Sequence, residues 1–206
     1  MDLTTLERVK VGLGDAGNQN DALLAQLITS ISVDLERRMK RYVQSAQRVE
    51  VVPVVSGYRC FSLRGTPLDP DSVAVVACPT RDFAGPEAFP YKANVDYVVD
   101  PENGLVNILR LFDTRIIGAT LAPLAPGFFQ VTYTGGLAAD TAGLIAAYPD
   151  LADACDLQVV HRFKRKDSAG AVKQTMGGTE STSTGEYKLL DRVEQVCAFY
   201  RRTVFT

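Results

Sequence analysis

Hydrophobic residues near the start of the chain recur with helical spacing. The pattern predicts a short helix over residues 5–11, which begins at a capping box of Thr4 and Glu7 and ends in the glycine-rich stretch 12–17. A longer helix follows, capped by Asn20 or by the aspartate after it. Its apolar positions lie three or four residues apart and are Leu24, Leu27, Ile28, Ile31, Leu35 and Met39.

The pattern changes in the middle of the chain. Between residues 48 and 130 the hydrophobic period is close to two and β-branched residues dominate, which favours strands. A hairpin turn is predicted at Asp-Pro-Glu-Asn-Gly, residues 100–104, because Pro presets one turn position and Asn-Gly tolerates positive φ. The predicted strands cover 48–55, 58–63, 72–78, 97–99, 105–109 and 128–134.

Helical spacing returns in the last third of the chain. A helix is predicted from Pro149 to about Lys166, with proline in the first turn and a wide apolar face. The Gly-, Ser- and Thr-rich residues 167–185 predict a solvated or partner-ordered loop. A final helix is predicted over 186–203.

These elements define the expected architecture. We predict an α+β fold in which N- and C-terminal helices form a small bundle and a β-rich domain is inserted between them. The N-terminal helices occupy residues 1–47, the β-rich domain 48–134, and the C-terminal helices with their loop 135–206. We expect the two helical parts to form one domain.

Composition narrows the function classes. The 206 residues are 46% hydrophobic and 22% charged with a net charge of −2, which excludes a disordered chain and does not favour a general nucleic-acid binder. No apolar run reaches the ~18 residues of a membrane span, and the polar, acidic start does not fit a signal peptide. The four cysteines form no CxxC pair, so we interpret them as reduced, mostly buried thiols of a protein made in a cytoplasm.

Candidate chemistry is sparse. His161, the single histidine, lies inside a predicted helix and has no nucleophile elbow to serve, so we interpret it as structural. Residues 12–17 have the letters of GxGxxG but follow a helix rather than a strand, which argues against nucleotide binding. Asp69 and Asp71 fit a turn, and the sequence places neither this pair nor Asp140/Asp150 across a cleft, so we do not assign them to acid–base catalysis. We therefore expect no enzyme activity, no metal and no cofactor.

Two basic clusters end the predicted helices. They are Arg37, Arg38, Lys40 and Arg41 in the first half of the chain and Arg162, Lys164, Arg165 and Lys166 in the second. Solvated helix ends explain such clusters most simply. The alternative is contact with DNA phosphates, which would carry no sequence information, or with an acidic partner.

Three stretches, in this order, resemble the head–tail connector (adaptor) proteins of long-tailed bacteriophages. The first is LTTLERVK at 3–10 followed by DALL at 21–24, the second is VTYTGG at 131–136 followed by PDLADA at 149–154, and the third is YKLL at 187–190 leading to FYRR at 199–202. The resemblance covers both helical ends and the junction between the β region and the third helix. The β region is longer than in the smallest family members.

The resemblance implies a structural virion protein. Such a protein forms a ring, commonly a dodecamer, beneath the portal at the neck of the particle, and is assembled in the bacterial host cytoplasm. The ring extends the channel for non-specific passage of double-stranded DNA and offers a docking surface to the next neck or tail protein. A near-neutral chain suits a conduit, because a strongly basic lining would grip phosphates.

The resemblance also implies where the portal binds. The candidate contact residues lie at the C-terminal end and are Phe199, Tyr200, Arg201, Arg202 and Phe205. Aromatic and arginine residues are also common interface hot spots. The alternatives are another neck or tail ring, such as a head-completion or tail-terminator protein, a phage-encoded hydrolase, or a DNA-binding regulator.

Overall fold

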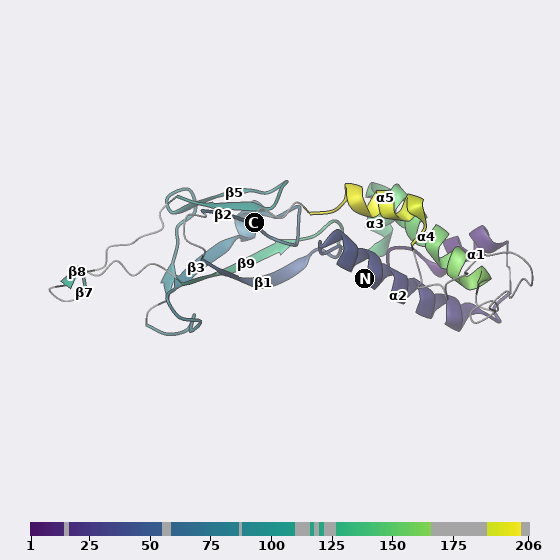
Figure 1. Cartoon of the computed structure of the whole chain (residues 1–206), viewed down its shortest axis with the longest axis horizontal. Helices are drawn as coiled ribbons and strands as arrows, with labels where there is room; N and C mark the ends of the chain where they lie inside the picture. The colour runs from purple at the N-terminus through teal and green to yellow at the C-terminus, as the bar shows by residue number, and fades with distance from the viewer. Residues whose placement is uncertain are drawn as a thin grey trace, which may run out of the picture. The chain divides into compact units, whose positions relative to one another are not determined.

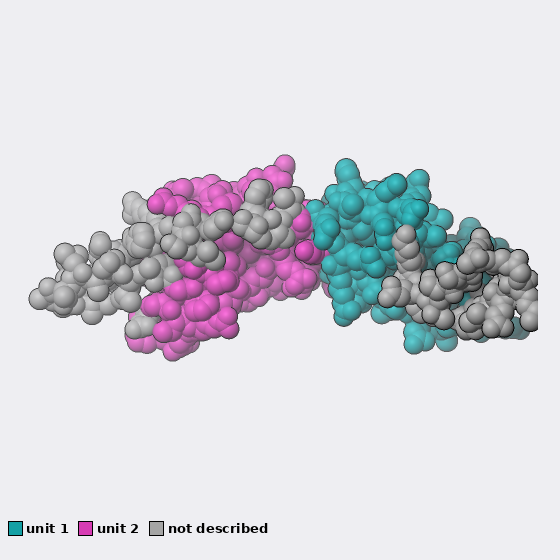
Figure 2. All heavy atoms as spheres, in the orientation of Figure 1, with its two compact units in different colours: residues 1–39, 140–201 teal, residues 40–139, 202–206 magenta. Residues whose placement is uncertain are grey.

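A computed structural model describes residues 1–14, 17–54, 59–86, 88–109, 116–117, 120–121, 127–165 and 189–202. The chain divides into two compact units (Figures 1 and 2). A helical unit consists of residues 1–39 and 140–201, and a β unit consists of residues 40–139 and 202–206. The predicted α+β class, with helices at both ends of the chain and strands between them, is confirmed.

Five described helices build the helical unit. They are α1 (Leu6–Leu13), α2 (Asp21–Met39), α3 (Thr141–Ala147), α4 (Pro149–Lys164) and α5 (Asp191–Phe199). Helix α2 packs against α4 and α5, while α4 also contacts α1 and α3. The apolar stripe predicted for α2 is largely confirmed, because five of its six residues are buried: Leu24, Ile28, Ile31, Leu35 and Met39. Burial of these faces supplies most of the helices' stability.

The start of α1 differs from the predicted capping box. Thr5, not Thr4, is the N-cap, and its side chain accepts a hydrogen bond from the Arg8 backbone N–H. Thr4 is buried instead, and its hydroxyl donates to the Asp156 carboxylate of α4. The tertiary contact with α4 therefore overrides the local motif. Gly14 ends the helix with φ of 68°, as the glycine pattern predicted.

A charged network ties α1 to α4. The Arg8 guanidinium contacts Asp153 at 2.6 Å and Asp156 at 3.1 Å. Burial raises the pKa of Asp156, while the Thr4 and Arg8 hydrogen bonds pull it down. The network fixes the position of α1 against α4.

The C-terminal helices begin and end differently from the prediction. Helix α3 was not predicted, although Asp140 caps it by accepting from the Gly143 N–H at 2.7 Å. Helix α4 ends at Lys164, close to the predicted end. Helix α5 ends at Phe199, four residues before the predicted end, and residue 200 is its C-cap. The predicted loop 167–185 and the expected start of the last helix at 186 lie outside the described residues.

The β unit contains two main antiparallel sheets. The four-stranded sheet has the order β1 (Ala46–Pro53), β9 (Phe128–Gly135), β3 (Ala74–Cys78) and β4 (Phe89–Pro90). The three-stranded sheet has the order β2 (Cys60–Ser62), β6 (Leu105–Ile108) and β5 (Tyr97–Asp100). Strands β7 (Ile116–Ile117) and β8 (Thr120–Leu121) form a two-stranded antiparallel sheet, and a 3-10 helix η1 spans Pro70–Ser72. All six predicted strands are present; β4, β7 and β8, two residues each, were not predicted.

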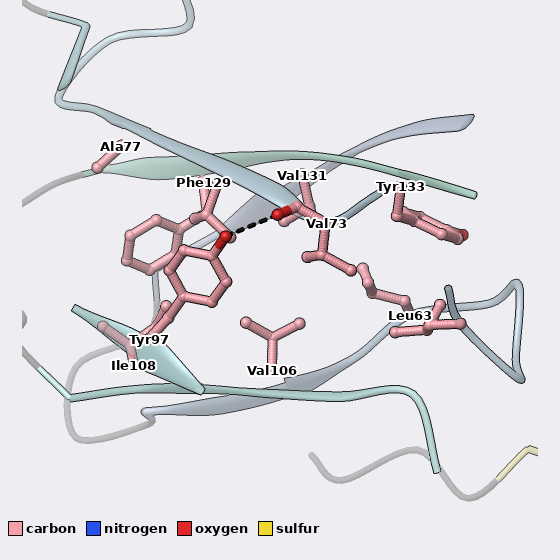
Figure 3. Packing of buried hydrophobic residues seen from close by; sticks show 11 residues of the cluster. Leu63, Val73, Ala77, Tyr97, Val106, Ile108, Phe129, Val131 and Tyr133 are labelled. Carbon is pink, nitrogen blue, oxygen red and sulfur yellow. Dashed lines mark hydrogen bonds between the residues drawn. The ribbon is translucent and has the colours of Figure 1, made fainter. Parts of the chain in front are cut away.

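The core of the β unit lies between the two main sheets (Figure 3). Phe129 of β9 stacks on Phe61 of β2 with ring centroids 5.8 Å apart. The Tyr97 hydroxyl of β5 donates to the Val73 carbonyl at 2.7 Å, so even this buried polar group is satisfied. The buried apolar members of the cluster are Leu63, Leu68, Val73, Val75, Ala77, Val106, Ile108, Phe129 and Val131.

The predicted hairpin turn is confirmed between β5 and β6. The Asp100 carboxylate accepts from the backbone N–H and the side-chain amide of Asn103. Gly104 has φ of 66°, and a Cβ there would collide with the Thr66 side chain. Glycine is the residue that adopts this positive φ readily and has no Cβ to collide with Thr66.

Candidate interaction surfaces

Three aromatic residues, Tyr148, Phe199 and Tyr200, form a cluster at the end of α5, which we call the aromatic step. The Tyr200 ring meets Tyr148 edge-on at 5.8 Å and Phe199 edge-on at 5.1 Å, and its hydroxyl donates to Asp150 at 2.8 Å. Phe199 is 80% exposed. Three aromatic rings therefore form a small scaffold in which Tyr200 is held from two sides and Phe199 is displayed to solvent. A large apolar ring fixed at a surface is suited to fill a pocket on a partner protein.

The residues predicted for portal contact belong to both units. Phe199, Tyr200 and the exposed Arg201 belong to the helical unit. Arg202 belongs to the β unit, where its Nε donates to the Ser62 hydroxyl at 2.9 Å and its Nη2 donates to the Ser62 carbonyl. Phe205 lies outside the described residues. The five residues therefore do not form one patch within a single unit.

Arg202 joins a polar cluster at the edge of the β core. The Glu50 carboxylate accepts from the Tyr133 hydroxyl and from the Arg64 backbone N–H at 3.0 Å, and the Gly65 N–H donates to the Tyr133 hydroxyl at 3.1 Å. Burial, and then Glu50, raise the pKa of Tyr133 well above its ordinary value. Burial lowers the pKa of Arg202, although Glu50 partly offsets this. The raised pKa keeps the Tyr133 hydroxyl protonated near neutral pH, so it can donate to Glu50.

The first basic cluster is also divided between the units. Arg37 and Arg38 are exposed on α2, and Arg38 lies 3.8 Å from Glu194 of α5. Lys40 and Arg41 fall in the β unit, and Lys40 adopts a left-handed φ of 53°. The four residues of this cluster are therefore assigned to two units.

The second basic cluster is partly occupied by an ion pair. Arg162 contacts Asp34 of α2 at 3.1 Å, so this arginine connects two helices of the same unit. Lys164 and Arg165 are exposed at the end of α4, and Lys166 lies outside the described residues. A DNA or acidic-partner role for either cluster stays a prediction.

Two exposed apolar groups on the β unit were missed by the sequence analysis. Val49 and Val51 are 56% and 44% exposed on β1, the edge strand of the four-stranded sheet. Val98 is exposed on β5, an edge strand of the other sheet, and Val95 before β5 and Leu109 after β6 are exposed too. The Leu109 N–H donates to the Asp96 carbonyl, which brings Leu109 next to the start of β5. The signal for β1 was available, because the letters Val-Glu-Val-Val place valine on both faces of a strand.

The cysteines and the histidine lie in surroundings typical of structural residues. The four cysteines are free, and burial raises the pKa of Cys155 to about 12. His161 is half-buried near the end of α4. Among the described residues, no group of three or more His, Cys, Asp and Glu side chains could hold a metal. The described helices include none that is both long enough and apolar enough to cross a bilayer.

Solved chains of gene transfer agent (GTA) particles share this fold. One from the virion of a native GTA particle has a TM-score of 0.57 at 18% identity, covering 99% of this chain and 91% of its own. A chain from the neck of an empty GTA particle, computed with C6 symmetry, has a TM-score of 0.59 at 18% identity, covering 98% and 90%. Another from the neck of a native GTA particle, computed with C12 symmetry, has a TM-score of 0.53 at 15% identity, covering 98% and 94%. No family model and no curated protein matches the chain.

These likenesses define a structural class. The shared fold extends over nearly the whole length of the chain and so includes both units. The matching chains occur in the virion and neck of a phage-like particle. The identities of 15–18% make this a statement about the fold.

Proposed function

We propose that this protein is a neck component of a phage-type particle, a head–tail connector that forms a ring beneath the portal. The observation that carries the proposal is the fold shared with GTA neck chains over 98% of this chain. The ring would extend the DNA channel and present a docking surface to the next neck or tail protein. The role is assembly and involves no catalytic step.

The aromatic step supports a protein contact at the C-terminal end of α5. Phe199 is displayed, Tyr200 is fixed by Tyr148 and Asp150, and Arg201 is exposed beside them. We assign portal binding to this step, with Phe199 as its anchor. Arg202 has a different role, because its guanidinium is engaged by Ser62 in the β unit.

The two exposed apolar groups of the β unit support lateral contacts between copies. A head-to-tail ring contact joins two different surfaces of the same protein, one from each neighbour. The β unit offers one apolar group at β1 and another at β5, on edge strands of different sheets. We assign β1 of one copy to a contact with β5 of the next.

Light scattering of the purified protein, alone and with its cognate portal, tests the proposal. A dodecamer would have about twelve times the mass of the 22.4 kDa chain. A ring in isolation, or a monomer that forms a stoichiometric complex with the portal, supports the connector role. A monomer that ignores the portal contradicts it.

The C6 symmetry of one matching neck particle gives a second candidate some support. A head-completion or tail-terminator ring would have a different neighbour and could have six copies. The mass gives the number of copies, and mixing with each neighbour gives the binding partner. A hexamer that does not bind portal but binds a tail protein favours the second candidate.

A further inference from the structure

Three arginines of the β unit converge around one tyrosine. The guanidinium carbons of Arg48 and Arg64 lie 3.9 and 4.5 Å from the centroid of the Tyr42 ring. Arg202 reaches the same place through Ser62, and its charge interacts with those of Arg64 and Glu50. Arg48 comes from β1, Arg64 follows β2, and Arg202 lies at the far end of the chain. We call Arg48, Arg64 and Arg202 the arginine cluster.

The arginine cluster carries more positive charge than its surroundings neutralise. Glu50 is the carboxylate that interacts with it, and one Glu50 oxygen already accepts from the Tyr133 hydroxyl and the Arg64 backbone N–H. Within the described parts of the chain, none of the three guanidiniums forms an ion pair within 4.0 Å. The Glu50 carboxylate thus acts on the charge of Arg202 without an ion pair to any of the three guanidiniums in the described residues.

Several donors of the arginine cluster have no acceptor among the described residues. In this part of the chain the buried Arg48 Nε has no hydrogen-bond partner, and Arg48 Nη2 donates to the Gln44 carbonyl. Among the residues that the structure describes, the Arg64 guanidinium makes no hydrogen bond. Buried donors are normally satisfied in a native protein, because a donor left without an acceptor loses its hydrogen bond to water and gains none in return. Stacking on Tyr42 keeps both guanidinium planes in place without using their N–H groups.

We propose that the arginine cluster binds a carboxylate side chain from an acidic segment of a partner protein. Guanidinium forks match a carboxylate through paired N–H···O bonds, which would satisfy the open donors of Arg64. The site is inferred from residues of the β unit alone. The identity of its partner, a neighbouring protein of the neck, rests on the proposed function.

The placement of the arginine cluster favours a carboxylate over DNA. All three arginines are half-buried rather than exposed, and they are gathered around one ring. DNA is usually held by exposed basic side chains that follow a run of phosphates. A glutamate or aspartate side chain projects from its backbone and can reach a recessed site of this size.

Nuclear magnetic resonance of the whole chain tests this site. The arginine Nε–Hε signals are followed while a hexaglutamate peptide is added, with hexaglutamine as the uncharged probe. We expect saturable shifts for Arg48, Arg64 and Arg202 with hexaglutamate alone. Arg64→Gln should weaken the peptide affinity at least tenfold, whereas Arg37→Gln, which removes the same charge from an exposed site on α2, should leave it within twofold.

Two further arms make the result decisive. Arg64→Lys keeps the charge but not the fork, so a weakened affinity supports paired recognition and an unchanged one overturns it. A short duplex DNA that shifts the same three signals more strongly than hexaglutamate overturns the carboxylate assignment in favour of phosphate. The proposed function fails separately, through a monomer that ignores the portal, whatever the peptide does.

Discussion

Tyr200 and Phe199 are neighbours in sequence with different environments. Tyr200 has two ring partners and a hydrogen bond to Asp150, while Phe199 has one ring partner and is mostly in solvent. Exposure of so large an apolar side chain lowers solubility and brings no gain to the isolated chain. The feature is useful if a partner covers it.

We expect Phe199→Ala to weaken portal binding at least tenfold. The ring would otherwise be buried in the complex, and anchors of this kind commonly contribute 2 kcal/mol or more, about thirtyfold in affinity. The free energy of unfolding should change by less than about 0.5 kcal/mol, because the side chain is exposed. Interferometry with immobilised portal measures the affinity. Val11→Ala, at an 83% exposed position on α1, is the matched control; an equal loss from both variants would refute the assignment.

Tyr133 should make the β unit sensitive to alkaline pH. Its pKa in the folded protein is raised above the ordinary 10.0, whereas the unfolded chain loses the phenol proton near pH 10. The folded state therefore binds more protons at alkaline pH, and this part of the stability is present below pH 10 and lost as pH rises above it. Tyr133→Phe should cost about 1–3 kcal/mol at pH 7 through the lost bonds to Glu50 and Gly65, and should flatten the decline above pH 10. Urea unfolding at pH 7 and pH 11 measures both, and an unchanged slope in the variant would count against the buried phenol as its source.

At the scale of elements, the sequence predicted what local chemistry determines. Helix α2, the six longer strands and the 100–104 turn follow from periodicity and turn residues, and the structure has them. The missed pieces depend on distant contacts or are very short. Thr4 does not form the predicted capping box, because its hydroxyl donates to Asp156, 152 residues later. Strand β4 is only two residues long, too short for a periodic pattern. Arg202 lies against Ser62, 140 residues earlier, which no local pattern could reveal.

The exposed face of β1 yields a test of ring assembly. Val51 pairs across the ladder with Gln130, so both point to the face opposite the core. We expect Val51→Lys to prevent association of copies, because it would bury a charge in an apolar contact. Light scattering should then give a monomer with a nearly unchanged melting temperature. Val11→Lys on α1 places the same charge elsewhere and should leave the ring intact; a normal ring from Val51→Lys would exclude β1 from the interface.

The whole molecule has two hydrophobic cores. One lies among the helices and includes the fully buried Val193 of α5, and the other lies between the sheets and depends on the Gly104 turn. Separate cores can unfold in separate steps even within one chain.

Calorimetry should therefore resolve two transitions. Val193→Ala should lower the one that belongs to the helical unit, since loss of buried methyl groups costs about 1–3 kcal/mol. Gly104→Ala should lower the other, because alanine would meet Thr66 and a positive φ. One transition that both substitutions shift equally would mean that the two cores unfold together.

The inserted position of the β unit sets an order of maturation. A ribosome delivers residues 40–139 before α4 and α5, so the β unit can close while α1 and α2 still wait for their partners. Phe199 is the last residue of α5, and it takes its place only when that helix docks. The contact proposed for the portal therefore forms only after residues 40–139 have been delivered. A copy cut before residue 199 would lack the proposed anchor, so that contact depends on a complete and docked α5.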